Sequence, residues 1–182
     1  MSSKINFVIS LLLISGSIIF AQTKKIEANK GESTITYQLT HPLHEIESTS
    51  KDAQCIIEYD RSSKTIKSVM VQVDVTTFNS GNSNRDSHAM EVIDALTYPY
   101  ANFTSTSVTQ NGNNLEVAGK LTFHGITKDI ILAATTSESN GKLVVKGNFS
   151  ISLTAFKVER PSLLMIPVKD ELRFTFTQVF NI

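Results

Sequence analysis

The sequence predicts an all-β protein that forms an eight-stranded antiparallel barrel, with a short helical segment between the third and fourth strands. Apolar and polar residues alternate with period two along most of the chain, as in strands that bury one face. Asn-Gly pairs at 111–112 and 140–141 fit the tight turns of hairpins. Closing eight such strands into a barrel removes exposed sheet edges, although a two-sheet sandwich is an alternative.

The first residues have the pattern of a secretory signal peptide. Lys4 precedes an apolar run at 5–20, which ends at the small residue Ala21. The run is short for a membrane-spanning helix, which needs roughly 20 apolar residues, so an uncleaved anchor is the weaker alternative. We expect residues 1–21 to be a signal peptide and residues 22–182 to be one exported domain. No stable membrane anchor is expected after cleavage.

Charge and cysteine content exclude some classes of function. The chain of 182 residues has 17 basic and 17 acidic side chains, and Lys4 is the one charged residue of the predicted signal. The mature domain therefore has a net charge of −1, which argues against a nucleic-acid partner. Cys55 is the single cysteine, so no internal disulfide stabilises the domain. Its place in an alternating segment predicts a buried, inert thiol.

Some of the eight predicted strands have small residues at positions that are expected to face inward. Gly119 and Gly147 interrupt apolar faces, and Ser105 and Ser107 are expected to face the same way as Phe103. Such residues either let barrel strands bend or leave a cavity for a slim apolar ligand, and both readings stay open here. The strands are predicted at residues 35–39, 55–59, 69–76, 100–110, 115–123, 127–137, 143–151 and 172–177.

The stretch between the third and fourth strands has helical features. Ser83 followed by Asp86 resembles a capping box with Asp in place of Glu. Met90, Ile93 and Leu96 fall on one face at helical spacing. We therefore expect a short helix that lies across one end of the barrel.

Several polar residues are candidates for chemistry. His88 with Asp86 or Arg85 would suit an enzyme that acts on an amphiphilic small molecule, but the sequence shows no partner base or substrate pocket. His41 and His44 have a spacing that two metal ligands can use, but no further ligand cluster accompanies them. We predict no catalytic residue and no metal site.

Four segments together resemble the YceI-like family, and they cover essentially the whole mature chain. The first is Asn84-Arg-Asp-x-His88 with Tyr98-Pro99 and Phe103-Thr-Ser105; the others are residues 119–128, 156–161 and 170–174. This resemblance implies an extended lipocalin-like barrel of eight antiparallel strands in an exported, usually periplasmic, bacterial protein. It also implies binding of a long polyisoprenoid or another amphiphilic lipid inside the barrel, without established catalytic residues.

The chain departs from the family pattern at one place. Residues 47–54 stand where a Gly-x-Phe element is often found in a loop that enters the second strand and borders the cavity. The apolar stretch 161–167 is unusual for a loop. It is expected to cover one end of the barrel, to mark the point where lipid enters, or to be buried beneath the barrel.

We therefore expect a periplasmic or secreted protein that holds an isoprenoid or fatty-acyl amphiphile, with no cofactor other than the bound lipid. A homodimer stays open. The alternatives are the enzyme described above and a ligand-free stress or interaction module with a filled barrel. Arg85, His88 and Arg160 are candidates for contact with a headgroup at the rim. The predicted lipid-contacting residues are Val71, Val73, Phe103, Val117, Leu121, Phe123, Leu143, Phe149, Phe174 and Phe176.

Overall fold

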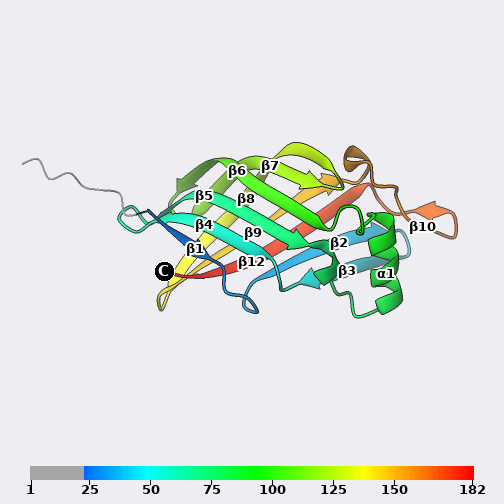
Figure 1. The fold of residues 1–182 in the computed structure, drawn as a ribbon, viewed down its shortest axis with the longest axis horizontal. Coiled ribbons are helices and arrows are strands. Elements are labelled where there is room, and N and C mark those ends of the chain that lie inside the picture. Colours follow the sequence, from blue (N-terminus) through cyan, green and yellow to red (C-terminus); the bar gives the residue numbers. More distant parts are fainter. Residues whose placement is uncertain (1–22) are drawn as a thin grey trace, which may run out of the picture.

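The computed structural model describes residues 23–182, so the predicted signal peptide lies outside the described residues. Ten strands form one curled antiparallel sheet, a half-barrel, with spatial order β1-β4-β5-β6-β7-β8-β9-β12-β2-β3 (Figure 1). The strands are β1 (Thr23–Glu27), β2 (Thr34–His41), β3 (His44–Ser50), β4 (Gln54–Asp60), β5 (Thr65–Asp74), β6 (Tyr100–Asn111), β7 (Asn114–Phe123), β8 (Ile126–Ser139), β9 (Lys142–Ser152) and β12 (Glu171–Asn181).

The all-β antiparallel fold is confirmed, and each of the eight predicted strands is present. The sheet contains two further strands, β1 and β3, which the alternation pattern did not predict. Residues 47–54 are not simply a loop, because β3 runs through Ser50 and β4 begins at Gln54. β3 is mostly polar on both faces, and it lies at an edge of the sheet beside β2.

Short connections close the curled sheet. Ala28 donates its backbone N–H to the Cys55 carbonyl on β4 at 2.8 Å, and Asn29 donates to the Val179 carbonyl on β12 at 2.7 Å. Elsewhere along the seam, Thr49 and Asn79 exchange two backbone hydrogen bonds of 3.1 and 3.0 Å. These bonds satisfy part of the open edges, so the barrel interior is enclosed without a continuous ladder across the seam.

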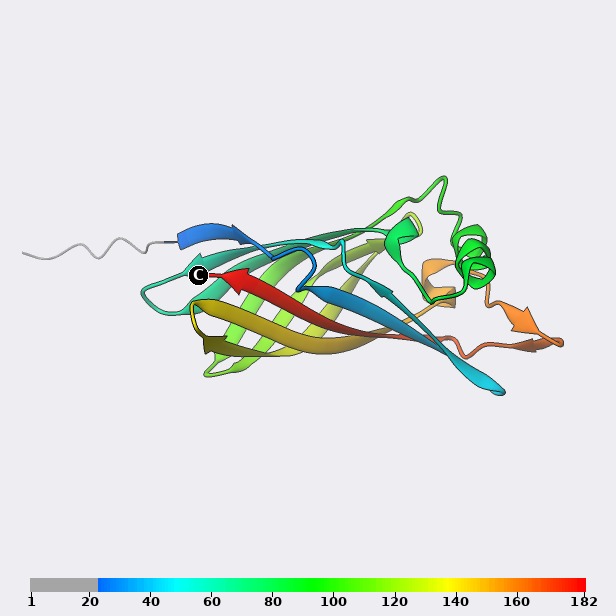
Figure 2. The same cartoon turned by 90° about the horizontal axis from the view of Figure 1, so that it is seen from below.

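The remaining elements lie at one end of the molecule. Helix α1 (Ser83–Val92) and the small hairpin of β10 (Ser162–Leu163) and β11 (Ile166–Pro167) lie at the end opposite the C-terminus (Figures 1 and 2). Two short 3₁₀ helices, η1 (Val75–Thr77) and η2 (Thr154–Phe156), follow β5 and β9. Within residues 23–182, no helix is long and apolar enough to cross a membrane.

Both predicted Asn-Gly turns lie in hairpins. Asn140 and Gly141 form the turn between β8 and β9, and both have the positive φ that a type I′ turn requires, 51° and 74°. The other turn is displaced by one residue, because Asn111 still belongs to β6 and the turn consists of Gly112 and Asn113.

The inward glycines make room for aromatic rings. A Cβ atom at Gly119 would lie 2.5 Å from Cζ of Phe103, and one at Gly147 would lie 2.5 Å from Cζ of Phe176. Each ring therefore lies against bare backbone, a known way for aromatic residues to cover glycine in a sheet. The space that the glycines provide is filled by these two rings, and neither of the two readings of the sequence anticipated this.

The two serines near Phe103 do not both face inward. The register between β6 and β7 shifts between Ser105 and Ser107, so the alternation changes phase there. Ser105 accepts a hydrogen bond from the Val69 N–H at 2.8 Å, whereas Ser107 is exposed and Val108 packs against the core. The prediction that Ser107 lies on the Phe103 face was wrong, because a bulge in the strand is invisible to a strict period of two.

Gly119→Ala is expected to lower the free energy of unfolding by about 1–3 kcal/mol in urea denaturation, because the added methyl group clashes with Phe103 and with the Thr104 carbonyl oxygen, also 2.5 Å away. Glu116→Ala, on the exposed face of the same strand, is the control and should change stability by less than about 0.5 kcal/mol. Equal stability of Gly119→Ala and the wild type would show that the ring does not need this space.

Candidate functional site

The concave face of the sheet encloses an apolar cavity of about 220 Å³. Its walls are the inward residues of nearly every long strand, and helix α1 contributes Asp86, Ala89, Met90 and Val92 at one end. The volume greatly exceeds the space that one water molecule needs. A barrel of this size is known to hold one small ligand, and an apolar lining suits a hydrocarbon chain.

Nine of the ten predicted lipid-contacting residues line this cavity, and contact with a lipid remains a prediction for them. The nine are Val71, Val73, Phe103, Val117, Leu121, Phe123, Phe149, Phe174 and Phe176. Leu143 is also buried and stands opposite Phe180 in the β9–β12 ladder, but it is not part of the lining. The alternation of apolar and polar residues correctly placed Leu143 on the inward face. The alternation does not show how far along the barrel axis a residue lies.

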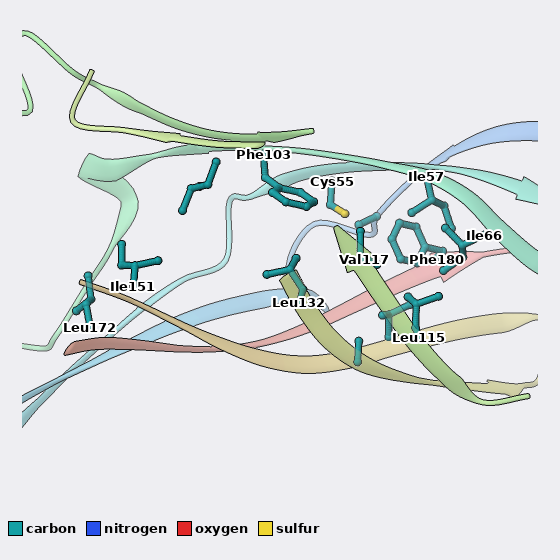
Figure 3. Packing of buried hydrophobic residues seen from close by; sticks show 14 of the residues in the cluster. Cys55, Ile57, Ile66, Phe103, Leu115, Val117, Leu132, Ile151, Leu172 and Phe180 are labelled. Carbon is teal, nitrogen blue, oxygen red and sulfur yellow. The ribbon is translucent and has the colours of Figure 1, made fainter. Parts of the chain in front are cut away.

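One end of the interior is packed shut. Ile57 and Phe180 are each 1% exposed, and they cluster with Ile66 and Leu115 at one end of the core, away from Ile151 and Leu172 at the other (Figure 3). Nearby, the Tyr59 hydroxyl donates to Oε1 of Glu138 at 2.6 Å. Burial and this bond to a carboxylate raise the pKa of Tyr59 to about 12. The phenol therefore stays neutral at this end of the interior.

Aromatic side chains form part of the cavity wall. Phe149 on β9 and Phe174 on β12 are paired across the strands, and their rings stack with centroids 4.7 Å apart. Tyr37 on β2 and Phe78 continue this wall, with ring centroids 5.2 Å apart. Flat, rigid rings give the cavity a smooth apolar surface that makes few directional demands on a ligand.

Helix α1 forms part of the mouth, but its details differ from the prediction. The N-cap is Asn82, not Ser83, and its side chain accepts the Arg85 N–H at 3.1 Å. Asp86 accepts the Ser80 N–H instead of closing a capping box. The helix ends at Val92, so Leu96 does not share a helical face with Met90 and is fully exposed, whereas Met90 and Ile93 line the cavity.

None of the three predicted rim residues lines the cavity. His88 is exposed and lies 3.7 Å from Glu91, one turn along the helix. Arg160 donates to the Val168 carbonyl oxygen at 2.8 Å from Nε and therefore holds its own loop. Arg85 is the chain neighbour of Asp86, which does line the cavity. Headgroup contact stays a prediction for all three, and the placement favours it least for His88.

The segments that carry the family resemblance meet at the mouth. The Tyr98 and His124 rings lie 4.9 Å apart, and a Cβ atom at Gly125 would lie 2.6 Å from the Tyr98 ring. His124 bonds through Nδ1 to the Phe156 carbonyl oxygen at 3.0 Å, and Phe156 packs edge-on against Phe123. Three segments far apart in the sequence therefore fix one loop cluster.

The stretch 161–167 is an exposed hairpin. Leu164 and Met165 form its turn and are 76% and 97% exposed, so the expectation that this stretch is buried beneath the barrel was wrong. The hairpin is tied to the β2–β3 turn, because His41 bonds through Nε2 to the Ile166 carbonyl oxygen at 3.0 Å. It lies at the same end of the molecule as α1 (Figure 2), and α1 contributes residues to the cavity lining.

His41 and His44 do not form a metal site. Their rings are 5.2 Å apart, but Nδ1 of His41 accepts the Leu43 N–H and Nε2 is engaged by Ile166, so neither nitrogen is free to bind a metal. Over residues 23–182, no group of three or more His, Cys, Asp or Glu side chains is arranged for a metal ion.

Some lining residues escaped the sequence analysis. Cys55 was expected to be buried, and burial does raise its pKa to about 12, but its position on the cavity wall was not predicted. Gln178 also lines the cavity. It falls on the same face as Phe174 and Phe176, so extending the alternation beyond residue 177 would have found it.

Comparisons of the sequence with known proteins point to one family. Residues 26–180 match the YceI-like domain. The chain is 29% identical to the protein YceI of Salmonella newport over 128 residues, which are 69% of this chain. The matched region spans 66% of that relative's length.

Two solved structures share the fold. The crystal structure of BcnA from Burkholderia cenocepacia superposes with a TM-score of 0.75 at 23% identity, covering 84% of this chain and 98% of that one. A polyisoprenoid-binding domain from Saccharophagus degradans, implicated in plant cell wall breakdown, superposes with a TM-score of 0.66 at 10% identity, covering 86% and 97%.

We expect the hydrogen bonds of Asp170 to make the stability of the protein sensitive to acid. Its carboxylate accepts from the Ser152 hydroxyl at 2.6 Å and from the Thr154 N–H at 2.9 Å, and these bonds hold its pKa below the usual range. A depressed folded-state pKa stabilises the protein above the unfolded-state pKa, and that contribution is lost as pH falls through the folded-state value. The melting temperature should therefore drop more between pH 6 and pH 3 in the wild type than in Asp170→Asn.

Asp129→Asn, which removes an exposed carboxylate on β8, is the control for the change in charge. The interpretation fails if Asp170→Asn and the wild type lose the same number of degrees over this range of pH.

Proposed function

Because this chain belongs to the YceI-like family, we propose that it is a lipid-binding protein that holds a long isoprenoid or fatty-acyl chain in its apolar cavity. The observation that carries the proposal is the enclosed hydrocarbon lining, packed at one end and bordered by α1 at the other. Burying a chain gains roughly 0.8 kcal/mol per CH₂ group. A long chain therefore binds tightly without many polar contacts.

The ligand class draws support from a structural relative. The Saccharophagus degradans domain with the same fold is described as polyisoprenoid-binding. The stacked Phe149–Phe174 wall suits a branched isoprenoid or a straight acyl chain, because it presents a broad apolar face without fixed polar groups. A cavity of this volume also argues against the alternative of a filled, ligand-free barrel.

Binding is favoured over catalysis. Of the residues proposed for an enzyme, His88 is exposed to solvent and paired with Glu91, and Asp86 is engaged with the loop at Ser80. His88 lies outside the cavity lining, and the Asp86 carboxylate, which borders the cavity, is bound to the Ser80 N–H, so the two do not face a substrate as an acid–base pair. The proposal therefore assigns no catalytic step to this cluster.

Val71→Trp should weaken binding of geranylgeraniol at least tenfold, because Val71 lines the cavity and the larger side chain would occupy it. Met70→Trp is the matched control, since Met70 is the neighbouring residue on β5 and is 52% exposed on the other face. Affinity is measured by displacement of a polyene fluorophore from delipidated protein. Equal affinity in the two variants, with both folded, would exclude the cavity as the site.

Export forms a second part of the proposal. The signal pattern at residues 1–21 is the observation that supports it, and an apolar carrier in the cell envelope needs such a leader. Expression of the full chain in a Gram-negative bacterium should give a periplasmic protein. Its intact mass, measured by mass spectrometry, should equal that of a chain that begins at Gln22. Retention of residues 1–21 on a cytoplasmic product would refute export.

A further inference from the structure

The cavity contains one buried polar group that the proposed function leaves unexplained. Gln178 lies on the inward face of β12 between Phe176 and Phe180, lines the cavity and is 4% exposed. Its Oε1 atom has no hydrogen-bond partner among the described residues. Leaving a buried acceptor unpaired costs about 1–3 kcal/mol, so such a group calls for a partner.

The orientation of the amide is fixed by the neighbouring strand. Nε2 of Gln178 donates to the Thr34 carbonyl oxygen on β2 at 3.3 Å. Turning the amide over would bring Oε1 against that carbonyl oxygen, and two acceptors repel each other. The unpaired atom of the amide is therefore Oε1, which is an acceptor, so the missing partner is a hydrogen-bond donor.

A lone water molecule is a poor candidate for this partner. The inward neighbours of Gln178 are Phe176 and Phe180 on its own strand and Val145 directly across the ladder on β9. Buried waters typically make about three hydrogen bonds, and these apolar side chains offer none. The polar groups on the β2 side, the Thr34 carbonyl oxygen and the Ser33 hydroxyl, already accept from Gln178 Nε2 and from the Val179 N–H. A hydrogen-bond donor that belongs to an apolar ligand would satisfy Oε1 of Gln178, and the hydrocarbon part of that ligand would pack against the apolar side chains around it.

The position of Gln178 shows which part of the ligand carries the donor. Leu172, six residues earlier on β12, lies at the end of the sheet near η2, and a strand rises roughly 3.4 Å per residue. Gln178 is therefore about 20 Å deeper along the wall than Leu172, one step before the closed end at Phe180. The donor belongs to the part of the ligand that lies deepest.

We propose that Gln178 accepts a hydrogen bond from an uncharged hydroxyl group at the buried end of the ligand, so that the cavity selects a long-chain alcohol or phenol. The inference rests on the proposed lipid-binding function and specifies its ligand. An anionic end is disfavoured because Oε1 is itself an acceptor, and a cationic end finds no carboxylate among the described lining residues except Asp86, at the mouth.

The experiment compares geranylgeraniol with its methyl ether, which keeps the chain and the oxygen but lacks the donor. Both compete for the polyene fluorophore bound to delipidated protein. The wild type should bind the alcohol roughly three- to tenfold more tightly, as expected for one neutral hydrogen bond. In Gln178→Met, which has similar size but no amide, the two ligands should bind within a factor of two of each other.

Gln72→Met is the control, because Gln72 lies on the exposed face of β5 and is not part of the cavity lining. It should keep the wild-type preference. Tight but equal binding of both ligands to the wild type would overturn the inference while leaving the proposed function intact, and this comparison needs no variant. A preference that survives in a folded Gln178→Met would also overturn it. Failure of the wild type to bind either ligand would contradict the proposed function itself.

Discussion

The cavity depends on where two phenylalanine rings lie. Phe103 and Phe176 each cover a glycine, Gly119 and Gly147, whose missing Cβ would otherwise collide with the ring. The rings lie against the sheet, so large apolar side chains can line a narrow half-barrel without filling it. Glycine in a strand is destabilising by itself, and the packing of an aromatic ring against it offsets this destabilisation here.

The two ends of the half-barrel have different physical characters. The end at Phe180 and Ile57 is closed by packed side chains, whereas the end at α1 is built from loops that several hydrogen bonds hold in place. The His124 bond to the Phe156 carbonyl and the Asp170 bonds to residues 152 and 154 belong to this second group. A ligand therefore has one direction of approach, with a rigid wall behind it and a pinned loop cluster around it.

The alternation of residues predicted the eight strands and the inward face correctly, because period two follows directly from strand geometry. It did not predict β3, which is polar on both faces, or the bulge at Ser105–Ser107, which shifts the phase. It also gave no depth along the barrel, so Leu143 could not be told from Leu121. Asn82 and Ser83 are both good N-cap residues, and the chain geometry alone decides between them.

The central claim is that the cavity holds a lipid in the cell. The most direct measurement is mass spectrometry of organic extracts from protein purified without detergent from its bacterial host. We expect a long-chain isoprenoid or acyl species in near-stoichiometric amount, and we expect it to be lost in a Val71→Trp variant of equal stability. Repeated absence of any lipid from the folded wild type, together with no uptake of added isoprenoid, would contradict it.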